Sequence, residues 1–564
     1  FSGQRRSAKF FAGKHVPSPS SLLHSHRQAL LILGLHFLFF LGINQLLNPH
    51  PDMVDHWIWG QHLSLSYYGY PPMIAWVFRL LTMILGDAEW ALEVGAQLVN
   101  LSVIALLYAI ARHAYGRKAA LSSLLVLCGM PYFTLGSVFL HISQPFMFFW
   151  LLTLYCWLRW VQTQDSRWLW GIGVAAGFGA LSKYIMILFY GGMMLHFLLY
   201  RELRRNLVNW RIYATGGLSL LIFSPDLVWN ARHEWSSYIY QLSRGTSGAE
   251  FGENTLLFSI GHLFLFSPLW FVIAMSLLYL NRNRLWNARS SESAIILVSM
   301  VPLVFFTLTS LKGSIADPHW ANLSYLGLAL LIGKGLNESP FAPFRNKLLA
   351  IGIGFNLVCI LLALWHVQSP LSDWEFYQMK NFVHLEEQGV SRTILERLQK
   401  EDKSAESRND YQQYLKETLD QDEYERWSSI ILKSAHDISW GRSASVLGWN
   451  ETAKQFQELL KNSGTPSLRF VVSREYQLSS ALSYWTNLRP RPWPHSLENP
   501  LRNQWSPEEE VRTGPSVFVC ELWDCEQSRE AFRERFSLNL LYLGEIDVHR
   551  KSRMIRNLLV YRIE

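Results

Sequence analysis

The chain has 564 residues, of which 50% are hydrophobic and 14% aromatic, and its formal net charge is +7. The apolar residues gather in blocks of about 17–25 residues, the length that crosses a hydrocarbon core of ~30 Å. This pattern excludes an ordinary water-soluble protein. The excess positive charge belongs to the short loops between the blocks, so a nucleic-acid partner is not indicated.

The chain divides into three regions by composition. Residues 1–27 are Ser-rich and basic and predict a disordered N-terminus, whereas residues 28–366 hold the apolar blocks and predict a membrane domain with a first outer loop at 47–90. Residues 367–564 are rich in charge and predict a water-facing domain. No small-residue cleavage site follows the first apolar run, so we expect an uncleaved span rather than a signal peptide.

The apolar blocks predict a polytopic α-helical membrane protein of about 11 transmembrane helices. The expected spans are 28–46, 91–111, 119–138, 144–161, 168–182, 185–200, 210–229, 255–280, 292–310, 320–335 and 347–366. A further block, 71–86, is short, starts with Pro-Pro and carries Arg79, so we expect a helix lying in the membrane interface.

Loop charges predict the orientation. With the N-terminus inside the cell, most loop Lys and Arg residues fall on the cytoplasmic side, as membrane proteins generally arrange them. The loop at 47–90 and the C-terminal domain then both lie outside the cytoplasm.

The outer segments carry unusual polar content. Carboxylates, imidazoles, cations and aromatic rings all fall on this one side, at Asp52, Asp55, His56, Tyr67, Tyr68, His141, Lys183, Arg232, His233, Arg244 and His319. A carboxylate can take a proton from a hydroxyl, and cations can stabilise a departing phosphate. A carboxylate–His group can also hold a divalent metal. The competing interpretation is an aromatic belt with interfacial charges.

Five motifs, in order along residues 45–335, give the chain a family resemblance. They are PDMVDHWIW followed by YYGYPPMIAW, LSKY, WNARHEW with YQLSRG, and PHWANLSYLGLALL. Together they resemble the GT-C superfamily of membrane glycosyltransferases, of the dolichyl-phosphate-mannose–protein mannosyltransferase and aminoarabinose transferase type. The resemblance implies a helical bundle with an outer-face active site in the bacterial inner membrane, and a periplasmic C-terminal domain.

The implied reaction moves a sugar, with inversion, from a polyprenyl-phosphate carrier to a lipid, glycan or protein acceptor. By resemblance Asp52 is the catalytic carboxylate, acting as general base. Lys183, Arg232, His233, Arg244 and His319 are the candidates for binding the carrier phosphate. Tyr67 and Tyr68 are expected to line the donor or its lipid, and Asp55, His56 and His141 are additional polar groups of the site.

The chain departs from the family pattern at three positions. Met53 stands where a Glu usually follows the Asp, Ser143 where an Asp usually precedes the Pro, and Tyr70 where aminoarabinose transferases place a Lys. These departures leave open a degenerate, non-catalytic relative. A transporter of lipid-linked sugars is a second alternative, although it would need ionisable groups in mid-membrane rather than at the ends of spans.

The C-terminal region alternates β-rich runs with helical segments. SLRFVVS, a helix near Tyr476–Trp485, SVFVCELW, NLLYLGEIDV and NLLVYRIE predict a small α/β domain. Cys520 and Cys525 lie on the oxidising side, and their spacing leaves a disulfide open.

Overall fold

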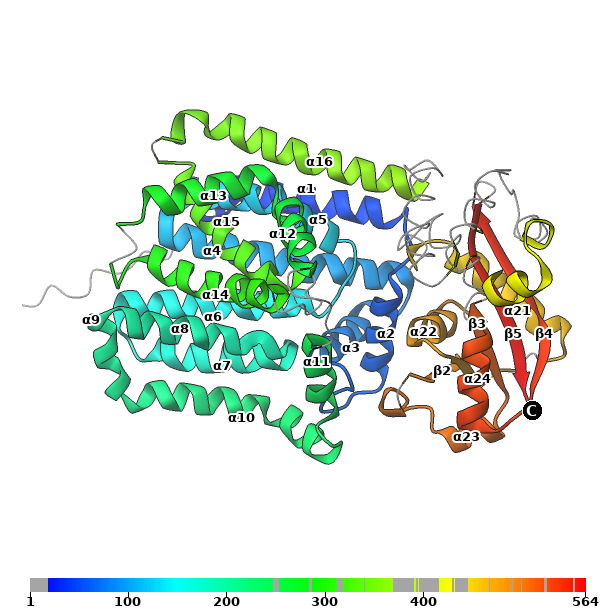
Figure 1. The fold of residues 1–564 in the computed structure, drawn as a ribbon. Coiled ribbons are helices and arrows are strands. Elements are labelled where there is room, and N and C mark those ends of the chain that lie inside the picture. Colours follow the sequence, from blue (N-terminus) through cyan, green and yellow to red (C-terminus); the bar gives the residue numbers. More distant parts are fainter. Residues whose placement is uncertain are drawn as a thin grey trace, which may run out of the picture.

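The computed structural model describes residues 19–246, 253–283, 287–311, 318–338, 340–368, 390–391, 394, 415–428, 431, 445–465, 467–486, 488, 490–498, 500–521, 525–550 and 553–564. A bundle of long helices forms one part and a small sheet domain the other (Figure 1). The short helices α2 and α3 lie at the end of the bundle that faces the sheet domain.

The bundle consists of long apolar helices joined by short connections. Its main helices are α1 (Pro19–Asn44), α4 (Glu89–Cys128), α6 (Ser143–Thr163), α7 (Arg167–Ser182), α8 (Ile187–Leu199), α10 (Trp210–Arg232), α12 (Glu253–Phe266), α13 (Pro268–Leu280), α14 (Ser291–Leu311), α15 (Asn322–Gly335) and α16 (Arg345–Gln368). Large rings such as Trp150, Trp157 and Trp270 fill the interior. Leu and Ile side chains of α1 and α16 face outward, as expected where lipid surrounds a bundle.

Each predicted span overlaps an observed helix, but the count of about eleven is not confirmed. Among the described residues, five helices are long and apolar enough to cross a membrane, or up to seven if each of two bent pairs is one span. The expected span 91–111 lies in α4, which bends at Gly116 (φ 83°), and the expected span 119–138 is divided between the end of α4 and the short helix α5 (Pro131–Gly136). The expected span 255–280 is broken into α12 and α13, which meet at 94° around Ser267. The chain is a multi-pass membrane protein.

Helix α3 (Met73–Leu85) corresponds to the expected interfacial helix. Its 13 residues cover about 20 Å, too little to cross the hydrocarbon core. Ile74 and Phe78 are buried against the protein, whereas Met83 and Ile84 are more than 70% exposed. One helix face therefore packs on the protein while the other offers apolar side chains to lipid.

The C-terminal part is built around a mixed five-stranded sheet with strand order β2-β1-β3-β5-β4. Its strands are β1 (Phe470–Ser473), β2 (Trp493–Ser496), β3 (Ser516–Glu521), β4 (Leu540–Arg550) and β5 (Arg553–Ile563). Strand β1 pairs in parallel with β2 and β3, and β5 runs antiparallel to β3 and β4. The helices are α21 (Trp449–Asn462), α22 (Tyr476–Trp485), α23 (Glu508–Thr513) and α24 (Cys525–Phe536).

A disulfide joins Cys520 at the end of β3 to Cys525 at the start of α24. Three cysteines of the bundle, Cys128, Cys156 and Cys359, are free. The pairing that the spacing left open is thus formed in the structure, in the domain that we expect on the oxidising side of the membrane.

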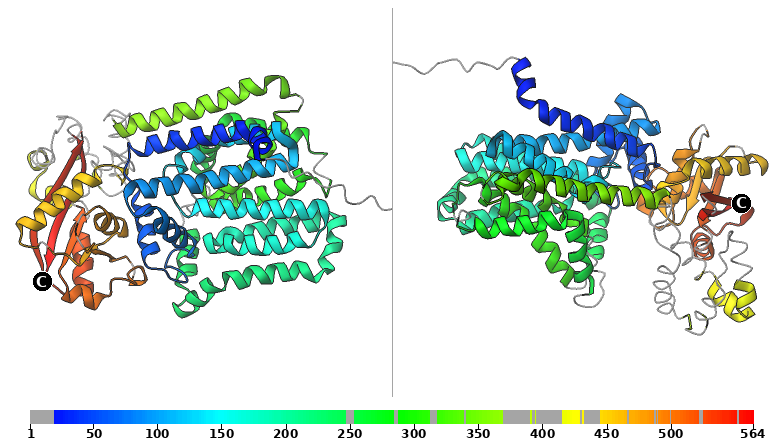
Figure 2. Two further views of the ribbon diagram at one scale, coloured as in Figure 1. Left: turned by 180° about the vertical axis from the view of Figure 1, so that it is seen from behind. Right: turned by 90° about the horizontal axis from the view of Figure 1, so that it is seen from above.

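The sheet domain docks on the first loop of the bundle. Helix α22 lies across α2 (Pro51–Gln61), with the Tyr484 ring centroid 5.1 Å from that of Trp57. At the edge of this contact, the Tyr484 hydroxyl donates to the backbone carbonyl of Asp87 at 3.2 Å. Arg491 forms an ion pair with the Asp87 carboxylate at 3.3 Å. Figure 2 shows the sheet domain against the end of the helix bundle, from behind and from above. The first loop of the bundle and the sheet domain are therefore packed directly against each other.

Candidate active site between the first loop and the C-terminal domain

Helix α2 places Asp52 at its positive end. Pro51 is the first helical residue, where its missing N–H costs nothing, and the side chain of His50 caps the helix by accepting from the Asp52 N–H at 3.1 Å. The Asp52 carboxylate therefore lies in the first turn, where the helix dipole favours negative charge. The sequence His-Pro-Asp thus both starts the helix and orients the acid.

The Asp52 carboxylate is held by the C-terminal domain. Its Oδ1 accepts from the Tyr476 hydroxyl at 2.8 Å and from the Gln477 amide at 2.7 Å. The side chain still keeps 26% of its surface exposed. Burial raises the pKa of Asp52, but His50, His141 and the Gln477 hydrogen bond together outweigh it and hold the pKa at about 2. Asp52 is therefore ionised at neutral pH and reachable by a ligand.

Two buried imidazoles lie beside this carboxylate. The rings of His56, on α2, and His141, just before α6, are 5.6 Å apart, and both residues act electrostatically on Asp52. Burial lowers the pKa of His56 to about 4, although Asp52 opposes the shift. Burial also holds the pKa of His141 well below its usual value. Burial therefore disfavours the charged form of both rings.

Lys183 and His319 complete the cluster. Lys183 caps the C-terminus of α7, and His319 lies in the 3₁₀ helix η4 (Pro318–Ala321) before α15. Both lie close enough to His141 to lower its pKa further. Five residues singled out in the sequence, from four separate segments, are thus brought together: Asp52, His56, His141, Lys183 and His319.

His56 has an unpaired polar atom inside this cluster. Its Nδ1 is buried and has no hydrogen-bond partner in the part of the chain that the structure describes. A buried polar atom without a partner is costly and needs an explanation, of which a bound water, ion or ligand is one. The Ser143 hydroxyl, where the family pattern has an Asp, lies 3.4 Å from Nδ1 of His141.

Asp55 faces the C-terminal domain, one turn further along α2. Its carboxylate accepts from the Ser480 hydroxyl at 3.0 Å and lies 3.7 Å from the Arg502 guanidinium. Burial raises the pKa of Asp55 to about 7, although Arg502 and Ser480 oppose the shift. The guanidinium of Arg502 also stacks on the Tyr476 ring at 3.9 Å and pairs with Glu498 at 3.3 Å.

The two tyrosines of the first loop differ in accessibility. Tyr67 is buried and stacks on Trp59 at 4.5 Å. Its hydroxyl lies within hydrogen-bond distance of two carbonyl acceptors, those of Trp59 at 2.9 Å and His62 at 2.8 Å, which share its single proton. Tyr68 is half-buried, and its ring lies 5.7 Å from the guanidinium of Arg502. These contacts give Tyr67 a role in holding the loop and leave Tyr68 nearer to the candidate site.

The candidates at the end of α10 are placed apart from the cluster. Arg232 is exposed, and His233 stacks on Trp229 at 4.0 Å with its Nδ1 2.7 Å from the Trp229 carbonyl. Within the described residues, neither side chain contacts Asp52 or His141. Arg244 ends up in α11 (Ser236–Thr246), but its side chain lies outside the described residues.

Asp226 of α10 organises the loop rather than the cluster. Its carboxylate accepts from Ser66 at 2.6 Å, Tyr184 at 3.1 Å, Tyr238 at 2.6 Å and Asn230 at 3.2 Å. These four donors come from the first loop, η1 (Tyr184–Met186), α11 and α10. Saturated in this way, Asp226 fixes the loop against the bundle.

Sequence reasoning missed the contribution of the C-terminal domain. Tyr476, Gln477, Ser480 and Arg502 all contact the two acids of α2. No motif marks them, and only the helical periodicity of 476–485 pointed to an ordered element there. Their pairing with α2 is a tertiary contact across more than 400 residues.

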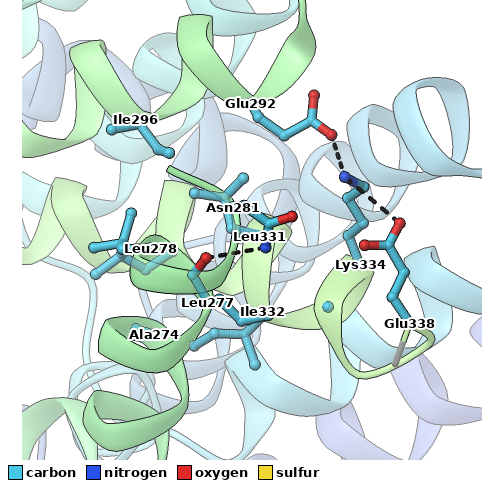
Figure 3. A pocket seen from close by; sticks show the side chains of 12 residues that line it. Ala274, Leu277, Leu278, Asn281, Glu292, Ile296, Leu331, Ile332, Lys334 and Glu338 are labelled. Atoms are coloured by element: carbon cyan, nitrogen blue, oxygen red, sulfur yellow. Dashed lines mark hydrogen bonds and ion pairs between the residues drawn. The ribbon is translucent and has the colours of Figure 1, made fainter. Parts of the chain in front are cut away.

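Neither a cluster of metal ligands nor a cavity points to a second functional site in the described residues. Within the described ranges, no three His, Cys, Asp or Glu side chains come together as metal ligands would. A cavity is lined by residues of α13, α14 and α15, among them Lys334, which lies between Glu292 and Glu338 (Figure 3). Because α15 begins close to His319 and its last turn lines this cavity, the two are about one helix length apart, roughly 20 Å.

The fold and parts of the sequence match known proteins. The model of the dolichyl-phosphate-mannose-protein mannosyltransferase family matches residues 70–229. ArnT from Cupriavidus metallidurans, solved in the apo state and bound to undecaprenyl phosphate, superposes with a TM-score of 0.59 at 15% identity, and the match with the bound form covers 95% of this chain and 98% of ArnT. The chain has the GT-C fold.

Two curated relatives of the chain come from Rhizobium johnstonii. The lipid A galacturonosyltransferase RgtD is 24% identical over 295 residues, which is 50% of this chain and 59% of RgtD. The lipopolysaccharide core galacturonosyltransferase RgtA is 24% identical over 363 residues, covering 59% of this chain and 71% of RgtA. The match to RgtD thus spans less than two thirds of its length.

Proposed function

We propose that the chain is an inverting glycosyltransferase that moves a sugar from a polyprenyl-phosphate carrier to an extracytoplasmic acceptor. The observation that carries this proposal is the Asp52 carboxylate, ionised and partly exposed at the start of α2, beside His56, His141, Lys183 and His319. The GT-C fold supports the same reaction class.

In this reaction Asp52 is the general base. The acceptor hydroxyl loses its proton to the carboxylate while its oxygen attacks the anomeric carbon, and the bond to the carrier phosphate breaks. The phosphate leaves with the bonding electrons. Lys183 supplies a positive charge for it. The leaving phosphate also favours the protonated form of His141, because an anion nearby raises the pKa of an imidazole.

The names of the relatives suggest the substrates. ArnT was solved with undecaprenyl phosphate, and RgtD and RgtA are galacturonosyltransferases of lipid A and of the lipopolysaccharide core. We therefore propose an undecaprenyl-type carrier, an acidic sugar such as galacturonate, and a lipid A or core acceptor. This assignment places the protein in a bacterial inner membrane with its site on the periplasmic face.

A transfer assay in membranes tests the proposal. Membranes containing the full chain are supplied with radiolabelled polyprenyl-phosphate galacturonate and lipid A, and the label recovered in lipid A is followed. We expect Asp52→Asn to lose at least 100-fold in rate, since one base typically contributes about 10²–10⁴-fold. The matched control is Asp165→Asn, because Asp165 lies in the loop between α6 and α7 and pairs only with Arg167 in the described structure.

The two outcomes separate the rival readings. Undiminished transfer by Asp52→Asn would remove this carboxylate from the mechanism. Absence of transfer by the parent with neutral and acidic donors alike would favour a degenerate relative, for which Met53 and Ser143 are the sequence argument.

A further inference from the structure

Helix α22 presents one face to the acids of α2. Tyr476, Ser480 and Tyr484 are spaced four residues apart and so lie on one side of the helix. Tyr476 and its neighbour Gln477 contact Asp52, and Ser480 contacts Asp55. The α2 and α22 helices are thus matched turn by turn.

Both donors from α22 end on the same oxygen of Asp52. The Tyr476 hydroxyl and the Gln477 amide donate to Oδ1, at 2.8 and 2.7 Å. In the part of the chain that the structure describes, Oδ2 accepts no hydrogen bond. Nδ1 of His50 lies 3.7 Å from Oδ2, which is too far for a hydrogen bond, and this nitrogen accepts from the Asp52 backbone N–H.

We propose that Tyr476 and Gln477 are positioning residues for the general base. They fix the Asp52 carboxylate through Oδ1 and leave Oδ2 as the atom that receives the proton of the acceptor hydroxyl. The C-terminal domain thereby completes the active site of the bundle. This inference rests on the proposed transferase function.

The transfer step balances with these atoms. The hydroxyl oxygen forms the new bond to the anomeric carbon, and its proton goes to Oδ2, which turns the carboxylate into a neutral acid. The old bond between the anomeric carbon and the phosphate oxygen breaks, and the carrier phosphate leaves with its electron pair. Two hydrogen bonds to Oδ1 stabilise the carboxylate and so weaken it as a base, but they hold Oδ2 in one place. Misplacing a reacting group by about 1 Å can cost 10²-fold, so orientation is the larger effect.

Kinetics of side-chain variants test this role. In the full chain, Gln477→Met removes one donor, Tyr476→Phe removes the other, and the double variant removes both. We expect kcat to fall about tenfold for each single variant and about 100-fold for the double variant. The KM for the polyprenyl-phosphate sugar should change less than twofold, because in this proposal neither Tyr476 nor Gln477 binds that substrate. The matched control is Gln455→Met on α21, whose amide bonds only Glu451 and the Asp547 carbonyl.

A pH-dependent variant separates positioning from a merely structural role. In Gln477→Glu, a protonated carboxyl can donate to Oδ1 as the amide does, whereas an ionised one cannot and repels Asp52. Relative to the parent, this variant should regain activity as pH falls from 8 to 6, and Gln477→Met should not. The charged and titratable groups that face Asp52 and its neighbours are His50, Asp55, His56, His141, Lys183, His319, Tyr476, Glu498 and Arg502. All of these groups are present in both variants, which differ only at residue 477. A difference between the two pH profiles therefore comes from the side chain at 477 and not from the titration of its neighbours.

Each result has a distinct meaning. A double variant with parental kcat, alongside an inactive Asp52→Asn, would overturn the positioning role and leave the transferase standing. A raised KM with unchanged kcat would also overturn it, because the residues would then bind substrate. Full activity of Asp52→Asn would instead sink the proposed function itself. If the double variant does not fold, as judged by its Tm in detergent, the Gln477→Glu and Gln477→Met comparison decides.

Discussion

At the scale of single residues, Asp55, which is buried beside Arg502, makes the stability of the protein depend on pH. Asp55 ionises near pH 4 in an unfolded chain, but burial raises its pKa to about 7 in the folded protein. Between these values the folded state holds more protons than the unfolded one. The free energy of unfolding contributed by this group therefore falls as pH rises from about 4 to 7.

Removing the guanidinium should make this dependence steeper. We expect Arg502→Met to lower Tm more at pH 8 than at pH 6, because at the lower pH Asp55 takes up a proton instead of remaining an unpaired charge. Breaking a buried pair costs up to about 3–5 kcal/mol. Adding Asp55→Asn should recover part of the loss. The control is Arg167→Met, since Arg167 is 89% exposed and water screens its pair with Asp165. Equal Tm losses at both pH values would contradict the argument.

At the scale of elements, the bundle depends on close helix contacts that small residues allow. Gly173 and Gly177 on α7 face α10, and a Cβ added at Gly177 would lie 2.7 Å from the Ile222 side chain. Such spacing of small residues lets two membrane helices approach closely. Lys183 is the C-cap residue of α7, so the packing of α7 on α10 also bears on where the Lys183 backbone lies.

A larger side chain at this contact should separate α7 from α10. We expect Gly177→Leu to reduce stability by about 1–3 kcal/mol or more through overpacking. Gly216→Leu on α10 is the control, since an added Cβ there meets nothing within 4 Å. Thermal unfolding of the purified protein in detergent measures both, and equal Tm values would refute the close-contact argument.

The elements also show what the sequence could predict. Apolar blocks located every main helix of the bundle, and alternation located four of the five strands, because both signals are local. Strand β2 was missed since Trp493–Ser496 is four residues long and contains Pro494. The break between α12 and α13 was missed as well. Ser267 at this break has a positive φ, a conformation that a Gly in the sequence would have indicated but a Ser does not. A motif pointed to Asp52 as a candidate, whereas its partners on α22 lie in no motif.

At the scale of the whole molecule, two features bear on which side of the membrane the site faces. The disulfide Cys520–Cys525 belongs to the C-terminal domain, which also bonds directly to Asp52. Disulfides persist in oxidising compartments. The domain and the candidate site therefore share one side, and we expect that side to be outside the cytoplasm.

Labelling of single cysteines measures this orientation. In intact cells, a membrane-impermeant maleimide should react with Glu451→Cys, an exposed position on α21, and not with Asp165→Cys in the loop between α6 and α7. Permeabilised cells should label both. The parent, with its disulfide and its three free cysteines in helices, gives the background. The reverse pattern of labelling would invert the topology.

The hydrogen bonds from α22 to Asp52 join residues 424 and 425 positions apart in the chain. At a synthesis rate of about 5–20 residues per second, roughly 20–90 s pass between translation of the acid and translation of its holders. During that interval the bundle can insert into the membrane, but both donors to the Asp52 carboxylate are still missing. Under the proposed positioning role, a chain truncated before α22 would therefore carry an Asp52 carboxylate that these two side chains do not hold.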